Sequence, residues 1–332
     1  MGEMAVTRKK GDQGELFGPV PVGKILPVLP PSRIKLRLIE SSAAIETDER
    51  QNIAYQHTVF CQTGLPYRDP GPEVREWERR QGSVALKVQA GEAMNPETGN
   101  WVKVGLPWGT KPRLILTHLN SQALKQGSPV IEVEESLSAF VKRIRGFNGG
   151  REIRMFKEQL SCLSASLIRM AMTRGDRAFQ IDTKVVTSFD LWLAKDDRQR
   201  VLWPSIVQLS LDYFESLQKH AVPLDERAIA ALSHSALGLD TYAWLAQRLH
   251  RIEAGKPQFI PWTALKAQFG ADYNRMDNFK RKFREVLRAV LTQYRAARIE
   301  MDDRGMMLWS SPPPIKGRIV LVNQALNPNR LQ

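Results

Sequence analysis

An α+β fold is predicted by three patterns in this sequence of 332 residues. Within residues 273–295, apolar side chains recur at three- and four-residue steps, which is the period of an amphipathic helix. A shorter helical pattern at 260–270 precedes it, with Pro261 near its start and Gly270 at its end. Alternating runs at 297–301 and 306–310 flank the turn sequence 302–305, which is typical of a β-hairpin.

This order of helix, turn, basic helix and hairpin is that of a winged helix-turn-helix, whose second helix enters the major groove of DNA. A similar order occurs earlier in the chain, with helices predicted at 110–124, 135–146 and 151–172 and strands at 130–133, 177–186 and 201–210. No residue-level repeat accompanies the repeated order. The sequence therefore predicts two tandem winged-helix domains, at 33–211 and 212–312, joined near 211–223.

The segments outside these domains have a different composition. Residues 1–32 are rich in Gly and Pro, which predicts a disordered or extended arm, and 313–332 are predicted to form a basic tail.

Between the arm and the helix at 110–124, we expect a short helix at 33–44, strands at 57–61 and 83–90, and a strand at 101–105 that pairs back across a turn at 95–100. In the second domain, Asp225 is predicted to cap a helix, and another helix is expected at 235–251.

The charge balance points to a polyanionic partner. There are 48 Lys and Arg against 35 Asp and Glu, a net charge of +13, and the calculated pI is near 9.9. Nucleic acid and an anionic membrane surface both fit this charge. No apolar run is long enough to span a bilayer and the N-terminus lacks the apolar core of a signal peptide, so we expect a soluble cytoplasmic protein without membrane association.

Double-stranded DNA is the partner favoured by the basic helix. Base contacts are expected near its start, because Asn side chains pair with adenine and Arg side chains with guanine in the major groove. The candidate DNA-binding residues in this part of the chain are Asn274, Arg275, Asn278, Lys280, Arg281, Lys282, Arg284, Arg288 and, at the hairpin turn, Arg304. Arg151, Arg154 and Lys157 are the parallel candidates in the first domain. The competing interpretation is that these cations only form the solvated face of a core helix.

Catalytic and metal sites are not indicated. The glycine-containing segment 105–111 does not fit the G-x-x-x-x-G-K-[ST] spacing, and two prolines remove amide donors near it. The five histidines are scattered, and Cys61 and Cys162 lie far apart without Cys or His at metal-ligand spacing. We therefore expect no catalytic residue, cofactor, metal ion or disulfide.

Several blocks of the sequence resemble the plasmid-encoded RepA family of replication initiators, and the likeness spans roughly 32–314. The blocks are LPWGTKPRLILTHLN at 106–120, RMFKEQL at 154–160, FDLWL at 189–193, VLWP at 201–204, LSLDYFESL at 209–217 and YAWLAQRL at 242–249. The resemblance implies binding to direct repeats (iterons) at a plasmid origin, opening of the duplex, and recruitment of the host initiator and replicative helicase. It also implies a bacterial, plasmid-associated protein and an inactive homodimer in exchange with an active monomer. The family brings no catalytic residues.

Two other functions remain open at this point. A winged-helix transcriptional repressor would bind an inverted-repeat operator as a dimer without melting DNA. A strand-nicking enzyme would form a covalent product on supercoiled origin DNA with a divalent metal.

Overall fold

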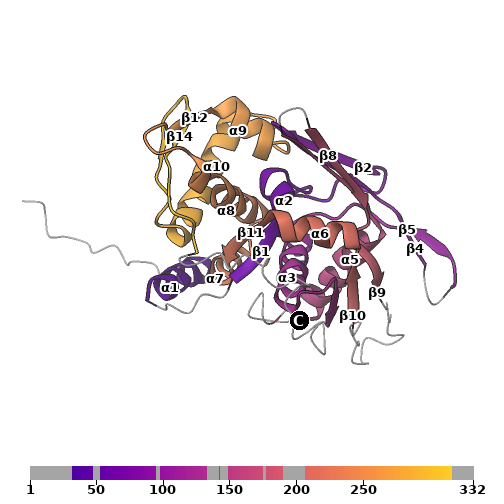
Figure 1. Cartoon of the computed structure of the whole chain (residues 1–332). Helices are drawn as coiled ribbons and strands as arrows, with labels where there is room; N and C mark the ends of the chain where they lie inside the picture. Colours follow the sequence, from indigo (N-terminus) through magenta and orange to yellow (C-terminus); the bar gives the residue numbers. More distant parts are fainter. Residues whose placement is uncertain are drawn as a thin grey trace, which may run out of the picture.

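Helices and strands both occur throughout the described part of the chain, and the strands form antiparallel sheets, which confirms the predicted α+β class (Figure 1). The computed structural model describes residues 32–47, 53–94, 98–132, 142, 149–174, 177–189 and 206–315. The predicted helix at 135–146 falls almost entirely outside these residues, as do most of the N-terminal arm and of the basic tail.

The elements fall into two halves in chain order. The first half contains α1 (Arg33–Thr47), β1 (Ile53–His57), α2 (Thr58–Gln62), β2 (Glu76–Gln81), β3 (Val84–Gln89), β4 (Glu92–Met94), β5 (Trp101–Lys103), α3 (Thr110–Gln126), β6 (Val130–Glu132), α5 (Gly150–Ala165), β7 (Leu167–Arg174), β8 (Arg177–Thr183), β9 (Val186–Phe189) and β10 (Ile206–Leu209). The second half contains α6 (Leu211–His220), β11 (Ala221–Asp225), α7 (Glu226–Leu232), α8 (Ala236–Arg248), η1 (Leu249–Arg251), β12 (Gln258–Pro261), α9 (Trp262–Phe269), α10 (Met276–Gln293), β13 (Ile299–Met301) and β14 (Gly305–Leu308).

The two halves share a sheet topology. In the second half, β12 follows α8 and pairs with the last strand of the chain, so that the sheet has the order β12-β14-β13. In the first half, β6 follows α3 and the corresponding sheet has the order β6-β10-β9. Among the described elements, only the first half also contains a four-stranded sheet, β2-β3-β7-β8, and the hairpin β4-β5.

A two-stranded antiparallel ribbon joins the halves. Strands β1 and β11 pair in register from Ile53 opposite Asp225 to His57 opposite Ala221, so Tyr55 and Pro223 form the central pair. The ribbon therefore has a local twofold axis between these two residues. Each strand leads into a short helix capped by the strand's last residue. His57 Nδ1 accepts from the Val59 amide at 3.2 Å, and Asp225 Oδ1 accepts from the Arg227 amide at 2.9 Å.

The helices that precede the ribbon strands cross over to the opposite half. Helix α1 precedes β1 but packs against α7 and α10, whereas α6 precedes β11 but packs against α3, β1 and β8. One hydrophobic cluster runs through both halves, from Val59 and Leu86 to Phe283 and Leu308. The exchange of helices and the shared core hold the two halves together as one packed body.

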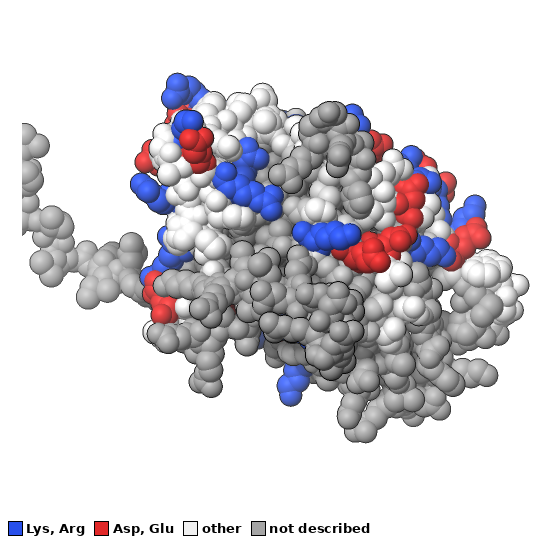
Figure 2. Space-filling view, in the orientation of Figure 1, with Lys and Arg blue, Asp and Glu red and all other residues white. Residues whose placement is uncertain are grey.

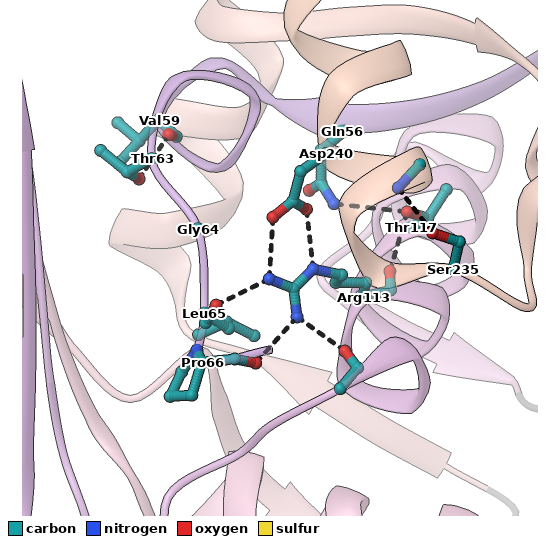
Figure 3. Close-up of polar contacts among 12 residues, drawn as sticks. Gln56, Val59, Thr63, Gly64, Leu65, Pro66, Arg113, Thr117, Ser235 and Asp240 are labelled. Carbon is teal, nitrogen blue, oxygen red and sulfur yellow. Dashed lines mark hydrogen bonds and ion pairs between the residues drawn. The ribbon is translucent and has the colours of Figure 1, made fainter. Parts of the chain in front are cut away.

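A buried ion pair also crosses between the halves (Figure 3). Arg113 of α3 donates from Nε to Asp240 Oδ1 of α8 at 2.7 Å and from Nη2 to Oδ2 at 2.8 Å. Its remaining N–H groups donate to the carbonyl oxygens of Leu65, Pro66 and Gly109. Both side chains are less than a tenth exposed, and the bidentate geometry with full hydrogen bonding is what a buried pair requires.

Two predicted elements were wrong in their extent. The helix expected at 151–172 ends at Ala165, because Ser166 caps it and residues 167–172 of strand β7 pair with β3. Ile168 and Met170 are buried with Arg169 between them, which is a two-residue period. The strand expected at 57–61 is wrong, because 58–61 lie in α2, which begins at Thr58, and the strand β1 precedes it at Ile53–His57. The segment 211–223, predicted as the joint, folds as α6 and most of β11.

Candidate nucleic-acid interface

Helix α10 is an amphipathic helix with a buried aromatic stripe, as its sequence predicts. Phe279, Phe283, Val286, Leu287, Val290 and Tyr294 are all at most 6% exposed. Phe279 and Phe283 pack edge-on against the Trp262 ring of α9, with centroid separations of 6.2 and 6.1 Å. The turn between α9 and α10 requires Gly270, since a Cβ there would lie 2.9 Å from the Lys266 carbonyl oxygen and 2.8 Å from the Phe279 ring. This packing fixes which face of α10 reaches the surface.

The outward face carries Asn274 and Asn278 near the helix start, with Arg281 and Arg288 further along. All four side chains are exposed. Neither Arg281 nor Arg288 has a carboxylate partner within the described part of the chain. These residues are the donors and acceptors of α10 that remain available to an external polyanion.

Two further cations on this face are paired within α10 or at its start. Arg275 donates to Asp277 at 2.6 Å, and Lys282 donates to Glu285 at 2.9 Å. The hydrogen bond from Arg275 is the main cause that lowers the pKa of Asp277. All four groups are substantially exposed, so these pairs are weak and phosphate can compete for the cations.

Lys280 and Arg284 face the β13–β14 hairpin instead of the open surface. Lys280 Nζ donates to the Asp303 carbonyl oxygen at 3.0 Å, and Arg284 donates to the Asp302 carbonyl oxygen and to Asp303 Oδ1, both at 3.3 Å. Both cations also lie over the Trp262 ring, at 5.3 and 5.1 Å from its centroid. The contacts of Lys280 and Arg284 with the turn hold the hairpin against α10. Both were predicted as DNA-binding residues, and no spacing in the sequence links them to Trp262.

Hydrogen bonds stabilise the hairpin turn, which carries side chains of both charges. Asp302 Oδ1 accepts from the amides of Arg304 and Gly305, each at 2.8 Å, and the Gly305 bond is the main cause that lowers the pKa of Asp302. A Cβ at Gly305 would lie 2.2 Å from the Ile260 carbonyl oxygen, so only glycine allows β14 to approach β12. Arg304 is 84% exposed and lies 5.9 Å from the Phe259 ring centroid. It is the hairpin's exposed cation.

In the first half, α5 occupies the place that α10 has in the second. Arg151 and Arg154 are exposed near its start, Lys157 is half-buried, and Phe156, Leu160 and Leu163 form its buried stripe. Helix α5 packs against β9 and α3. The candidates in the two halves therefore lie on separate helices, one beside each three-stranded sheet.

Surface charge is mixed on the face drawn in Figure 2. Blue Lys and Arg groups lie around the second half, and red acidic groups stand next to several of them. No group of three or more His, Cys, Asp or Glu side chains in the described residues could hold a metal ion. No described helix has both the length and the apolar character to cross a membrane.

Comparison with known proteins finds a family that matches the central part of the chain. Residues 106–264 match the family described as plasmid-encoded RepA protein. No curated protein matches this sequence. Two crystal structures of domains 2 and 3 of RctB, one of them a selenomethionine derivative, align with a TM-score of 0.44 at 9% sequence identity. These alignments cover 74% and 75% of this chain and 95% and 94% of the RctB chains.

The family match includes α3, α5 and α8, and it ends within α9. It contains the resembling sequence blocks from 106–120 to 242–249. The match over residues 106–264 therefore confirms the resemblance to the plasmid-encoded RepA family in this part of the chain.

Proposed function

We propose that this chain binds repeated sites at a plasmid origin through two winged-helix units and opens the duplex without breaking a covalent bond. The main support is the outward face of α10, where Asn274, Asn278, Arg281 and Arg288 are exposed while the opposite face is buried. In a winged helix, the helix in this position lies in the major groove. Helix α5 with sheet β6-β10-β9 is the second such unit.

The β1–β11 ribbon suggests how the two units face DNA. Its local twofold axis passes between Tyr55 and Pro223, and the helix that precedes each strand of the ribbon packs on the opposite half. Two recognition helices related in this way read their half-sites in opposite directions. We propose that one chain occupies one repeat, with α5 and α10 in successive major-groove faces roughly 34 Å apart. Successive repeats at the origin are then direct repeats, each with inverted halves.

Duplex opening follows from the energy of several bound repeats. Bending a site of this size costs on the order of 1–10 kcal/mol, which the phosphate and base contacts of neighbouring chains offset. We further propose that the bound chain recruits the host initiator and the replicative helicase. It acts in the bacterial cytoplasm on its plasmid, and exchange between a homodimer and the active monomer regulates it.

Footprinting on the DNA that flanks the gene tests this proposal. We expect protection of direct repeats with one chain per repeat, measured by hydroxyl-radical cleavage and by the mass of the complex. The double variant Arg281→Ala/Arg288→Ala should lose the protection, whereas Arg80→Ala, which removes an exposed arginine from β2, should retain it.

The number of protein chains bound at each DNA site distinguishes a repressor from an initiator. Inverted halves within one repeat make a palindromic footprint compatible with both functions, so the number of chains per site decides. Two chains on a single palindrome, with no permanganate-reactive thymines nearby, would support the repressor.

The nicking alternative has its own assay. We expect supercoiled origin DNA to remain intact after incubation with the protein and Mg²⁺ or Mn²⁺. A nicked product that carries covalently bound protein would refute the proposal.

A further inference from the structure

Segment 62–68, which begins at the last residue of α2, is held by side chains of the first half. Trp77 Nε1 of β2 donates to the Gly64 carbonyl oxygen at 2.8 Å. Arg113 Nη2 of α3 donates to the Leu65 carbonyl oxygen at 2.7 Å (Figure 3). The Leu65 side chain is buried in the shared core. The backbone of the segment therefore has a fixed position relative to β2 and α3.

The same segment is connected to the start of α5 through the residues at the start of α3. The Gly109 amide donates to the Pro66 carbonyl oxygen at 2.9 Å. Two residues after Gly109, Lys111 Nζ lies 3.5 Å from Glu152 Oε1 in the first turn of α5. Both side chains of this ion pair are at most 15% exposed, so solvent screens it less than a surface pair. Segment 62–68 and the first turn of α5 therefore belong to one connected set of contacts.

Segment 62–68 also contacts the second half, at α9 and at the turn before α10. Gln268 Nε2 of α9 donates to the Gln62 carbonyl oxygen at 2.9 Å. Arg68 Nε lies 4.0 Å from Asp272 Oδ2 in the turn between α9 and α10. Asn274, the first candidate base contact, is two residues further on. The segment therefore connects the starts of α5 and α10, which lie far apart in the chain.

These polar contacts add a directional restraint to the shared core. The hydrophobic effect is non-directional, whereas hydrogen bonds weaken steeply when donor and acceptor move out of line. We propose that segment 62–68, with Arg68 and Gln268 as positioning residues, fixes the orientation of α10 relative to α5 and thereby sets the spacing of half-sites that one chain accepts on DNA. The first part depends only on contacts within the chain, and the second part rests on the proposed function.

The geometry of DNA makes this restraint measurable. Half-sites one helical turn apart are separated by about 34–36 Å over about 10–10.5 base pairs. One added base pair therefore shifts a half-site by about 3.4 Å and turns it by about 35°. Two recognition helices held in a fixed relation lose contacts at one half-site under this change. Helices that can move relative to each other retain most of their contacts.

The first experiment measures the relation between α5 and α10 in the full chain without DNA. Spin labels on Glu158→Cys of α5 and Glu285→Cys of α10, both at exposed positions, report the distance distribution by double electron–electron resonance. Cys61 and Cys162 are buried, so we expect them to react little with the label. In the otherwise native chain we expect one narrow distance distribution.

Arg68→Ala/Gln268→Ala removes two contacts of segment 62–68 with the second half, and we expect the distance distribution to broaden or to shift. Arg169→Ala/Gln180→Ala is the matched control, because it removes an arginine and a glutamine that form hydrogen bonds on the four-stranded sheet. The control distribution should equal that of the native chain. An unchanged distribution in Arg68→Ala/Gln268→Ala would overturn the proposal.

The second experiment uses the repeat that the native chain protects, with one base pair inserted or deleted between its halves. The measured quantity is the ratio of affinities for the native and the altered spacing, which cancels any uniform loss of a phosphate contact. We expect a ratio of about ten or more for the native chain, since one mismatched base pair already costs about 5- to 150-fold. For Arg68→Ala/Gln268→Ala the ratio should fall below about three, because α10 can follow the displaced half-site.

Equal ratios for the native chain and the double variant, or a native ratio near one, would overturn the role in spacing. A native chain that protects no two-part repeat would refute the proposed function and with it the role in spacing. The distance measurement without DNA would still decide whether segment 62–68 holds α10 in its relation to α5.

Discussion

Arg281 and Arg288 differ from Lys280 and Arg284 although all four are cations of the same helix. The first two are exposed and lack carboxylate partners among the described residues, whereas the other two bind carbonyl oxygens of the hairpin turn above Trp262. At the residue scale, a side chain's surroundings therefore decide its role. The first pair is suited to phosphate or base contacts and the second pair to holding the hairpin.

The salt dependence of DNA binding distinguishes the two roles. For Arg288→Ala, we expect the slope of log affinity against log salt to fall by about 0.9, the value for one phosphate contact. For Lys280→Ala, affinity should fall with little change in slope, because that cation contacts the hairpin. Titration at several salt concentrations measures both quantities, and an equal loss of slope in both variants would contradict this assignment.

The buried pair of Arg113 and Asp240 makes a prediction about stability. Asp240→Ala leaves the guanidinium of Arg113 buried without its carboxylate, so the free energy of unfolding should fall by about 3–5 kcal/mol. Asp303→Ala is the matched control, because Asp303 is fully exposed and its pair with Arg284 should be worth less than about 1 kcal/mol. Urea denaturation measures both changes. A loss below about 1 kcal/mol for Asp240→Ala would show that the pair does not join the halves.

His57 predicts how stability depends on pH. It is fully buried, its Nδ1 accepts from the Val59 amide, and its Nε2 lies 2.9 Å from Ser216 Oγ, which suits a neutral ring that donates from Nε2. Burial, with a smaller contribution from His220, lowers the pKa of His57 to about 3. The unfolded chain therefore binds a proton below about pH 6.5 that the folded chain does not, and stability falls with pH through this range.

Because of His57, the free energy of unfolding should be about 2 kcal/mol lower at pH 5 than at pH 7. In His57→Gln, the slope of unfolding free energy against pH should be smaller by up to about 1.4 kcal/mol per unit between pH 6 and 4. Denaturation at a series of pH values gives both slopes. Burial also lowers the pKa of His220 and His250, so a residual slope of the same sign should persist in the variant.

At the scale of elements, α10 and the β13–β14 hairpin act as one piece. The hairpin contacts α10 through the turn carbonyl groups, and its strand β14 pairs with β12 just before α9. Arg284→Ala removes two of the contacts between turn and helix. We expect faster amide hydrogen exchange at 301–305 and unchanged exchange within α10. Exchange mass spectrometry with Arg281→Ala as the control tests this, and equal exchange in both variants would mean that Arg284 does not hold the turn.

At the scale of the whole molecule, the ribbon and the exchanged helices set the relation between α5 and α10. If each helix reads one half of a repeat, variants in the two halves should affect different halves of one footprint. We expect Arg154→Ala to reduce protection over one half-site and Arg281→Ala over the other. Hydroxyl-radical cleavage at single-nucleotide resolution measures this. Loss of the same half-site in both variants would place the two helices on one groove.

The sequence by itself determined the elements whose signals are local. The apolar period of 273–295 defines α10, Asp225 caps α7 as predicted, and alternation around 302–305 gives the hairpin. The sequence blocks that resemble the plasmid-encoded RepA family lie in the segment that the family model matches. Contacts of high sequence separation were not visible in the sequence. The local pattern of residues 167–172 predicts a helix, but these residues form a strand because they pair with β3. The segment 211–223 was predicted as the joint between domains, but it contains α6, which packs on the first half.

Only the tertiary structure separated the exposed cations of α10 that lack carboxylate partners from those that hold the hairpin, and paired Arg113 with Asp240. Each of these depends on segments far apart in the chain meeting in three dimensions, and side-chain periodicity along one helix carries no information about the partner it meets.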